Sequence, residues 1–190
     1  DLETQPTTAD LKQPGDVLFL LSPSGWCHAD SIGASEYLSF CHDRTTGDAP
    51  HLALDEEVAV QDATRALIRE GIVQHAHDVS DGGLAVCLAE SAIHSDSLGL
   101  DVTLPEAGAT RLDAVLFGEA QSRVVLSVQP GDADALDAAL ADHDTVQAHR
   151  LGTVAESGIR VAVGDTPVVN ADRTTLAEPY TSAIPDAVAA

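Results

Sequence analysis

The order of apolar and polar positions along the chain predicts alternating strands and helices. An almost continuous apolar run at residues 16–21 follows Pro14-Gly15 and is typical of a buried strand. Residues 98–104 instead place an apolar side chain at every second position, which is typical of a strand with one buried face. Further strands are expected at residues 72–79, 123–128, 146–154 and 159–163, the last two paired around the turn Glu156-Ser157-Gly158.

Helical periodicity is clearest at residues 55–70. Asp55 is placed to cap this helix, acidic residues fill its first turn, and Gly71 follows its end. Residues 83–94 predict a second helix whose first half is nearly all apolar. Shorter or weaker helical segments are expected at residues 34–41, 111–117, 132–142 and 176–183.

These elements predict one domain over residues 1–190, loosely ordered at residues 1–13 and 184–190. A chain of 190 residues with 44% hydrophobic residues is large enough to bury a single core. Strands and helices are interleaved without a strict βαβ order. The expected fold class is therefore α/β (α+β), with helices flanking a mixed sheet.

The charge is strongly negative, with 31 acidic residues against 9 basic ones and a formal net charge of −22. The apolar content argues against an acidic disordered chain, and no cluster of basic residues is present to neutralise nucleic-acid phosphates. No apolar run approaches the roughly 20 residues that span a bilayer. Lys12 is the single lysine, and an acid-rich, lysine-poor composition favours a salt-in halophile over an acidic mesophilic protein.

The cysteines and the first residue add two expectations. Cys27, Cys41 and Cys87 form no CxxC pair and leave an odd thiol, which favours a reducing cytoplasm over a disulfide scaffold and matches no zinc-site spacing. The chain contains no methionine and begins with Asp1, so we expect it to be a fragment of a longer protein.

The most informative segment is residues 75–84, HAHDVSDGGL, where a predicted strand ends and a helix begins. Ligands commonly bind at such junctions in open α/β sheets. Asp81 is placed to cap the helix, and Gly82 and Gly83 let backbone N–H groups approach a phosphate closely. Asp78 and Asp81 offer hard oxygen ligands for Mg²⁺. The alternative is a capped turn packed by glycines, with Asp78 solvated.

Two further segments carry polar groups at element junctions. Residues 116–123, LFGEAQSR, alternate Glu119, Gln121 and Arg123 with small residues, as expected of a strand edge that presents polar groups to a ligand. The alternative is a polar turn with a surface ion pair. Residues 31–37, SIGASEY, either open a helix over an anion or form a tight turn.

None of the common catalytic motifs occurs, whether GxSxG, HExxH, a P-loop or GxGxxG. His75 and His77 alternate along one predicted strand. A histidine that points into the core with a satisfied ring is favoured there over a general base. The sequence therefore offers no catalytic residue.

Taken in order, the segments GDVLFLL, GASEYL, HDVSDGGLAVCLAES and LFGEAQSRVVLSV resemble the synthetase part of the phosphoribosylformylglycinamidine synthase family. The resemblance covers about residues 16–128 and is diffuse beyond them. It implies a domain of an ATP- and Mg²⁺-dependent carbon–nitrogen ligase of purine biosynthesis. This ligase activates the formyl amide of formylglycinamide ribonucleotide and adds ammonia from glutamine, giving formylglycinamidine ribonucleotide.

The resemblance also implies an architecture and partners. The family's synthetase has two repeats, each with an ATP-binding half and a C-type half, and this chain is similar to the second C-type half. Its expected fold is that of the C-terminal domain of aminoimidazole ribonucleotide synthetase. Expected partners are the ATP-binding halves of the same chain, a glutaminase subunit and small accessory subunits, the ribonucleotide substrate, and neither nucleic acid nor membrane.

Site residues carry over by motif position. In the first C-type half of the family, the aspartate that opens the equivalent turn binds Mg²⁺, which corresponds here to Asp78, with Asp81 the lesser candidate. A Glu-Ser-Gln triplet there contacts substrate, and Glu119-Ala120-Gln121 stands in its place here. Together with Gly82 and Gly83, this triplet is the expected nucleotide, phosphate or substrate site. The second repeat of the family commonly holds a structural nucleotide or a degenerate site, and no catalytic residue is expected in this chain.

Two alternatives remain open. In the first, the chain is a non-catalytic structural and interaction module of the same synthetase and not a domain that takes part in the ligase reaction. In the second, the chain belongs to another member of the superfamily, such as the aminoimidazole ribonucleotide, selenophosphate or thiamine monophosphate enzymes. The segments GASEYL and FGEAQSR favour the formylglycinamidine enzyme over these relatives.

Overall fold

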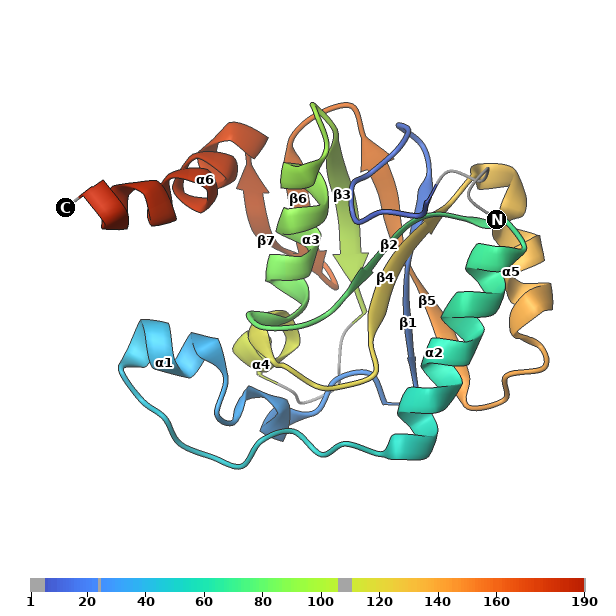
Figure 1. Cartoon of the computed structure of the whole chain (residues 1–190), viewed down its shortest axis with the longest axis horizontal. Helices are drawn as coiled ribbons and strands as arrows, with labels where there is room; N and C mark the ends of the chain where they lie inside the picture. The colour runs from blue at the N-terminus through green and yellow to red at the C-terminus, as the bar shows by residue number, and fades with distance from the viewer. Residues whose placement is uncertain (1–5, 24, 106–110, 190) are drawn as a thin grey trace.

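A single mixed sheet forms the centre of the molecule in the computed structural model, which describes residues 6–23, 25–105 and 111–189 (Figure 1). The strand order is β2-β4-β1-β5-β3-β6-β7, with antiparallel pairing everywhere except between β3 and β6. The expected fold class, a mixed sheet flanked by helices, is confirmed. The strands are β1 (Val17–Pro23), β2 (Val73–Asp78), β3 (Gly99–Leu104), β4 (Val124–Val128), β5 (Val146–Ala155), β6 (Ile159–Val163) and β7 (Thr166–Ala171).

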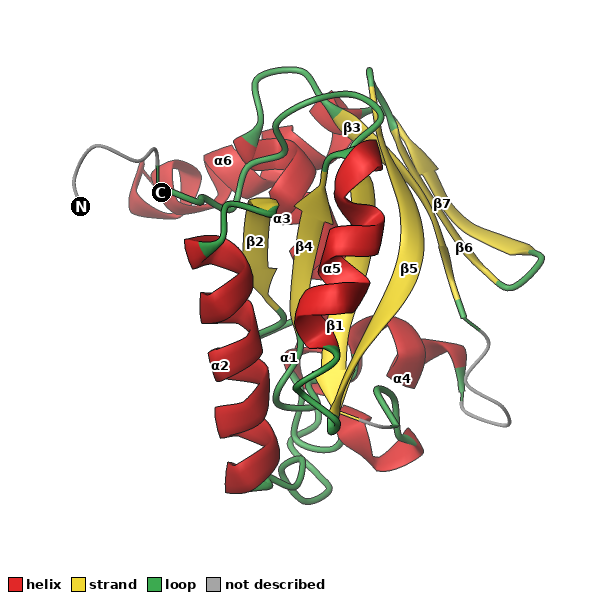
Figure 2. Cartoon of the chain, turned by 90° about the vertical axis from the view of Figure 1, so that its right-hand side faces the viewer, coloured by secondary structure: helices red, strands yellow, loops and turns green. Residues whose placement is uncertain are grey.

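Helices cover both faces of the sheet. Two of them, α2 and α5, lie against the face formed by β2, β4, β1 and β5, whereas α3 and α4 cover the opposite face (Figures 1 and 2). Short 3-10 turns precede α1 and α5, at η1 (Ala29–Ile32) and η2 (Pro130–Asp132). The helices are α1 (Glu36–His42), α2 (Leu54–Arg69), α3 (Gly83–His94), α4 (Leu112–Phe117), α5 (Ala133–Leu140) and α6 (Arg173–Ala189).

The central strand β1 explains why its sequence is apolar without interruption. Leu18 and Leu20 point to the α3 side, whereas Phe19 and Leu21 point to the α2 and α5 side, and all four are buried. A strand covered by helices on both faces needs apolar side chains at every position. The prediction of a buried strand here is confirmed.

The predicted hairpin between residues 146–154 and 159–163 is wrong. Strand β3 lies between β5 and β6, antiparallel to β5 and parallel to β6. Gly99, at the start of β3, passes so close to the turn that a Cβ there would lie 1.7 Å from the carbonyl oxygen of Gly158. The short turn between β5 and β6 therefore packs against the start of β3 and does not join two paired strands.

The C-terminal part holds a strand that the sequence pattern did not predict. Strand β7 is an edge strand paired with β6, and its residues are exposed or only partly buried. An edge strand needs little apolar content, and Pro167 is tolerated there. The helix expected at residues 176–183 is present and longer, as α6. Arg173 holds its start in place by donating to the carbonyl oxygens of Ala92 and Ile93 at the end of α3.

Other boundaries differ in detail. Helix α2 has Ala53 as its N-cap residue, without a side-chain cap, so the expected cap by Asp55 is wrong; Asp55 lies in the first turn. The N-terminal segment contacts the body of the domain, because Leu11 is buried and Thr8 bridges His75 of β2.

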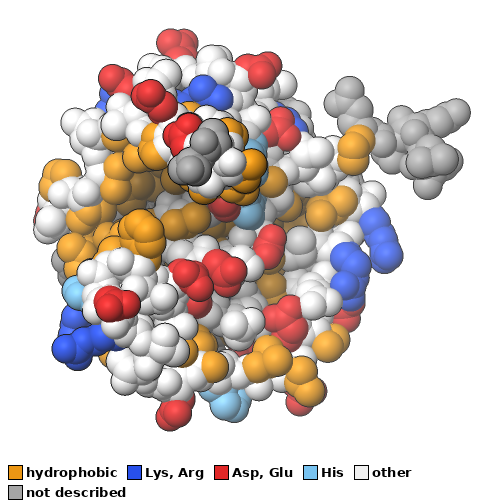
Figure 3. All heavy atoms as spheres, turned by 60° about the vertical axis from the view of Figure 1, so that its left-hand side comes forward, with side chains coloured by type: hydrophobic (Ala, Val, Ile, Leu, Met, Phe, Trp, Pro, Cys, Tyr) orange, Lys and Arg blue, Asp and Glu red, His pale blue; other side chains and the backbone are white. Residues whose placement is uncertain are grey.

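Acidic side chains are scattered over the face shown in Figure 3, with few basic ones among them. The surface thus carries the excess charge that the composition requires. Among the described residues, no helix is both long enough and apolar enough to cross a membrane.

Candidate functional site

The three sequence segments that carry candidate chemistry meet at one end of the sheet, beside the start of α3. Glu119, in the loop between α4 and β4, donates its backbone N–H to the carbonyl oxygen of Ser31 at 2.8 Å. One oxygen of its side chain, Oε1, accepts the backbone N–H groups of Glu36 and Gly82, both at 2.9 Å. One carboxylate therefore ties the starts of α1 and α3 to the loop that carries it.

This arrangement changes the predicted role of the turn before α3. The N-cap residue of α3 is Gly82 with no side-chain cap, so the expected cap by Asp81 is wrong, and Asp81 is exposed. The N–H of Gly82 donates to Glu119, and the N–H of Gly83 donates to the carbonyl oxygen of Ser80 at 3.0 Å. A phosphate that bound these N–H groups would have to replace the Glu119 carboxylate.

Close backbone packing holds the junction together. A Cβ at Gly83 would lie 2.7 Å from the carbonyl oxygen of Gly118, and a Cβ at Gly118 would lie 2.3 Å from the hydroxyl of Ser31. Gly83 also has a φ of +70°, which side-chain-bearing residues rarely adopt. The segments converge because glycine lets their backbones touch.

Residues 119–123 form a loop with a bend, and β4 begins only at Val124. The prediction that Glu119, Gln121 and Arg123 lie along a strand edge is therefore wrong. The Gln121 side chain is exposed and donates to the carbonyl oxygen of Glu119 at 3.3 Å. Ser122 has a φ of +60° and its hydroxyl donates to Glu57 of α2 at 2.6 Å. The turn is thereby anchored to α2 while Ala120 and Gln121 remain at a pocket.

Asp78 ends β2 with its carboxylate largely in solvent, 77% exposed. It lies 3.7 Å from Nδ1 of His77. Within the described ranges, no group of three or more His, Cys, Asp or Glu side chains is arranged to hold a metal ion. One exposed carboxylate fits a Mg²⁺ whose other ligands are phosphate oxygens and water, and it does not form a protein cage for the ion.

Arg123 is buried, with 3% of its surface exposed. Its Nε donates to the carbonyl oxygen of Ala120 at 2.9 Å and its Nη2 to that of Gly118 at 2.6 Å. Burial lowers the pKa of the guanidinium to about 10, which leaves it charged at neutral pH. Among the described residues Arg123 makes no ion pair, contrary to one of the two alternatives for this segment.

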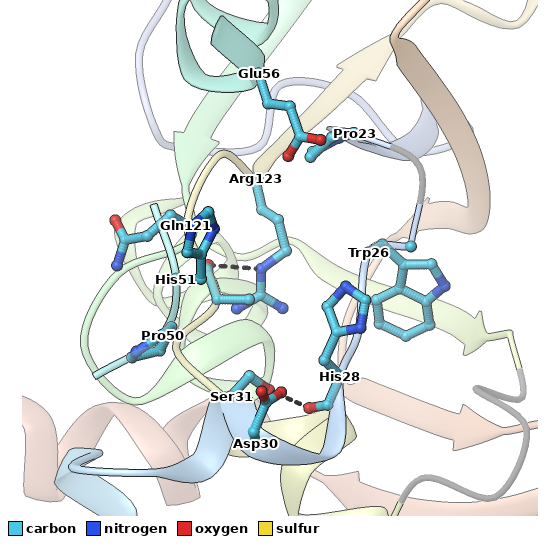
Figure 4. Close-up of a pocket in the computed structure, with 12 residues that line it drawn as sticks. Pro23, Trp26, His28, Asp30, Ser31, Pro50, His51, Glu56, Gln121 and Arg123 are labelled. Carbon is cyan, nitrogen blue, oxygen red and sulfur yellow. Dashed lines mark hydrogen bonds between the residues drawn. The ribbon is translucent and has the colours of Figure 1, made fainter. Parts of the chain in front are cut away.

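A pocket of about 280 Å³ opens over Arg123 (Figure 4). The guanidinium points into it, with the imidazole rings of His28 and His51 on opposite sides and Trp26 beside His28. Sequence reasoning missed these three aromatic side chains, because they lie in loops that precede η1 and α2 and form no motif. The lining comprises Pro23, Gly25, Trp26, His28, Asp30, Ser31, Pro50, His51, Glu56, Ala120, Gln121 and Arg123.

The two histidines of β2 have different surroundings. His75 is fully buried, as expected of a core histidine, and its Nε2 lies 3.0 Å from the hydroxyl of Ser91. Its Nδ1 has no hydrogen-bond partner among the described residues, so only one of the two ring nitrogens is satisfied. Burial lowers the pKa of His75 to about 3, so its ring is neutral near pH 7. His77 is half-buried, and its Nε2 lies 3.2 Å from a carboxylate oxygen of Glu90. Neither ring lines the pocket over Arg123.

Comparison with curated proteins gives subunits of phosphoribosylformylglycinamidine synthase among the relatives. The chain is 67% identical over 188 residues to the phosphoribosylformylglycinamidine synthase subunit PurL of Salinibacter ruber, an alignment that covers 99% of this chain and 25% of that protein. It is 46% identical over 129 residues to the PurL subunit of Deinococcus radiodurans, covering 66% of this chain and 17% of that protein. The chain thus spans about a quarter or less of the length of these relatives.

Solved structures share the fold. The phosphoribosylformylglycinamidine synthase II of Thermotoga maritima superposes with a TM-score of 0.72 at 19% identity, over 90% of this chain and 27% of that one. The T. maritima PurL complexed with FGAR superposes with a TM-score of 0.75 at 21% identity, over 90% of this chain and 29% of that one. A family model described as "AIR synthase related protein, C-terminal domain" matches residues 13–164. The chain therefore belongs to the family of AIR synthase related C-terminal domains.

Proposed function

We propose that this chain is a domain of an ATP-dependent carbon–nitrogen ligase of purine biosynthesis. The ligase converts formylglycinamide ribonucleotide and glutamine-derived ammonia to formylglycinamidine ribonucleotide. The observation that carries the proposal is the 67% identity to the Salinibacter ruber PurL subunit along almost the whole of this chain. Because the chain spans 25% of that subunit, it supplies one part of the proposed enzyme and has no ligase activity alone.

The proposed partners follow from the same relationship. The domain packs against the remaining parts of a PurL-type synthetase, works with a glutaminase subunit and small accessory subunits, and acts in the cytoplasm. The T. maritima relatives support a nucleotide and a ribonucleotide as ligands, since they are described as complexes with ATP and with FGAR, and one is described as PurLQS.

The proposed binding surface for nucleotide, phosphate or substrate consists of Gly82, Gly83, Glu119, Ala120 and Gln121. What supports it is the meeting of these residues at the start of α3, where the helix dipole favours negative charge. The carboxylate of Glu119 accepts the N–H of Gly82. An incoming phosphate takes over that N–H only when the carboxylate turns away, so Glu119 would act as an internal competitor for anionic ligands.

Asp78 is the proposed metal contact, with Asp81 the lesser candidate. Bound Mg²⁺ bridges nucleotide phosphates and neutralises their charge. Asp78 contributes one exposed carboxylate at the end of β2, next to the turn that leads into α3. Its role is to orient the ion, since no group of three or more His, Cys, Asp or Glu side chains among the described residues is arranged to enclose it.

A chimera tests the proposed function. The corresponding quarter of the Salinibacter ruber subunit is replaced by this chain, and ATP- and ammonia-dependent formation of formylglycinamidine ribonucleotide is measured. We expect the chimera to retain activity within about tenfold of the parent, because most contacts are preserved at 67% identity. The chain by itself should give no product. A folded but inactive chimera, or turnover by the isolated chain, would contradict the assignment.

Two substitutions in the chimera separate a ligand-binding domain from a structural module. The exposed Asp78 and the lack of a metal cluster among the described residues are what favour the structural alternative. For a binding domain, Asp78→Asn should abolish Mg²⁺-dependent nucleotide binding at the site this domain contributes, with an unchanged melting temperature. Asp137→Asn is the matched control, since it changes an exposed carboxylate on α5, outside the proposed binding surface. Wild-type nucleotide stoichiometry and affinity in Asp78→Asn would leave only the structural module.

A further inference from the structure

The pocket over Arg123 encloses a positive charge that the chain does not neutralise. Among the residues that the structure describes, no carboxylate lies within ion-pair distance of the guanidinium. Buried charges are normally paired, because removing an ion from water costs much more than burying a neutral group. A buried arginine whose partners are two backbone carbonyls therefore has an unmet preference for an anion.

The geometry of Arg123 shows where that anion would bind. Nε and Nη2 already donate to Ala120 and Gly118, whereas Nη1 has no hydrogen-bond partner within the described part of the chain. The guanidinium points into the pocket, whereas the amide of Gln121, a lining residue, is turned away from it (Figure 4) and donates to the carbonyl oxygen of Glu119. The donors that remain thus face the cavity and not the core.

We propose that this pocket binds the phosphate group of a small molecule. The two carbonyl contacts occupy the side edge of the Arg123 guanidinium, so an anion binds at its end, where Nη1 and the second N–H of Nη2 remain. A tetrahedral phosphate presents oxygens in several directions, and the imidazoles of His28 and His51 supply N–H donors from opposite walls. The volume of about 280 Å³ accommodates a phosphate with a small attached group.

Two acidic residues oppose an anion at this site. Asp30 and Glu56 also line the pocket, but both are exposed, so water and salt screen their charges. Arg123 lies at the buried floor, where its charge acts through a medium of low dielectric constant. The balance therefore favours phosphate at the floor, and the rim carboxylates weaken its affinity.

The phosphate site shares Ala120 and Gln121 with the proposed nucleotide or substrate surface, but phosphate binding there does not depend on the ligase activity. It adds Arg123, His28 and His51 as binding residues, and it concerns a cavity that the start of α3 does not line. Failure of the chimera to turn over would leave it untouched, because the test below measures binding by the chain alone.

Inorganic phosphate is the probe, titrated into the 190-residue chain in about 1 M KCl and followed by calorimetry and ³¹P NMR. We expect saturable binding at one site, with acetate at equal concentration failing to compete. Arg123→Gln should weaken the affinity about tenfold or more, and His51→Asn about threefold. Glu56→Gln should tighten it about threefold, whereas Glu70→Gln, an exposed acid outside the pocket, should leave it unchanged.

If Arg123→Gln does not fold, the variants at the exposed pocket residues His51 and Glu56 still test the proposal. Absence of saturable phosphate binding by the folded wild-type chain would overturn the proposal. Equal competition by acetate would overturn the preference for phosphate. If Glu70→Gln tightened binding as much as Glu56→Gln, the effect would be that of the overall charge, and the pocket would not be the site.

Discussion

The carboxylate of Glu119 accepts the backbone N–H of Gly82 at 2.9 Å, across 37 positions of sequence. The same oxygen accepts the N–H of Glu36, so one side chain joins the start of α3 to the start of α1. A negative charge at the N-terminus of a helix is favourable, and hydrogen bonds to charged acceptors are stronger than neutral ones. Glu119 therefore has a structural role, which is to hold the starts of α1 and α3 against the loop between α4 and β4.

Replacing Glu119 should therefore destabilise the fold. We expect Glu119→Ala to lower the free energy of unfolding by about 2–3 kcal/mol, since two backbone N–H groups lose a charged acceptor. Glu119→Gln keeps an oxygen acceptor and should cost about 1 kcal/mol. Urea unfolding at constant salt measures both. Equal losses in the two variants would contradict this account, because Glu119→Gln keeps an acceptor oxygen for the two N–H groups.

Gly83 and Gly71 form a matched pair that isolates backbone crowding. Their φ values are +70° and +74°, but a Cβ at Gly83 would meet Gly118 and Phe117 within 3 Å, whereas one at Gly71 would meet nothing within 4 Å. Alanine at either position should cost about 1–2 kcal/mol from its left-handed backbone. Gly83→Ala should lose about 1–3 kcal/mol more from the clash. Comparable melting temperatures for the two variants would contradict the tight packing of α3 on the α4–β4 loop.

The buried ring of His75 should make the fold sensitive to mild acid. Its pKa falls from 6.5 to about 3 on folding, so between these values the unfolded chain binds a proton that the folded chain does not. Stability contributed at neutral pH is therefore lost as the pH falls below about 6.5, by about 2 kcal/mol at about pH 5.

His75→Gln should remove this part of the pH dependence, measured as the free energy of unfolding from about pH 7 to about pH 5. Ser91→Ala is the control, because it deletes the hydrogen bond to the ring and keeps the imidazole. It should lower stability by about 1 kcal/mol at every pH. An unchanged slope in His75→Gln would mean that other groups cause the acid sensitivity.

Salt should stabilise the protein. With a net charge of −22, the acidic side chains repel one another, and salt screens that repulsion. The melting temperature should rise steadily between about 0.1 and 3 M KCl. Potassium chloride is compared with an equal osmolality of sucrose, which is excluded from the protein surface but does not screen charge. A flat or falling curve in KCl would reject adaptation to high salt.

The sequence determined the identity of most elements, because hydrophobic periodicity is a local property. The run at β1 and the amphipathic pattern of α2 predicted a buried strand and a covering helix, and both are present. The sequence patterns also singled out the turn around Gly83 and the loop around Glu119, since glycines and polar residues at element junctions mark such places.

Only the tertiary structure decided which of these segments touch. The partner of β5 is β3 and not its neighbour β6, because strand pairing depends on the packing of whole layers. The cap of α3 is Glu119, far along the chain, where local reasoning favoured Asp81. Trp26, His28 and His51 line the pocket over Arg123, although they come from loops that carry no sequence motif. Periodicity reports which face of an element is buried, whereas the contacts of a site arise between elements and leave no local pattern.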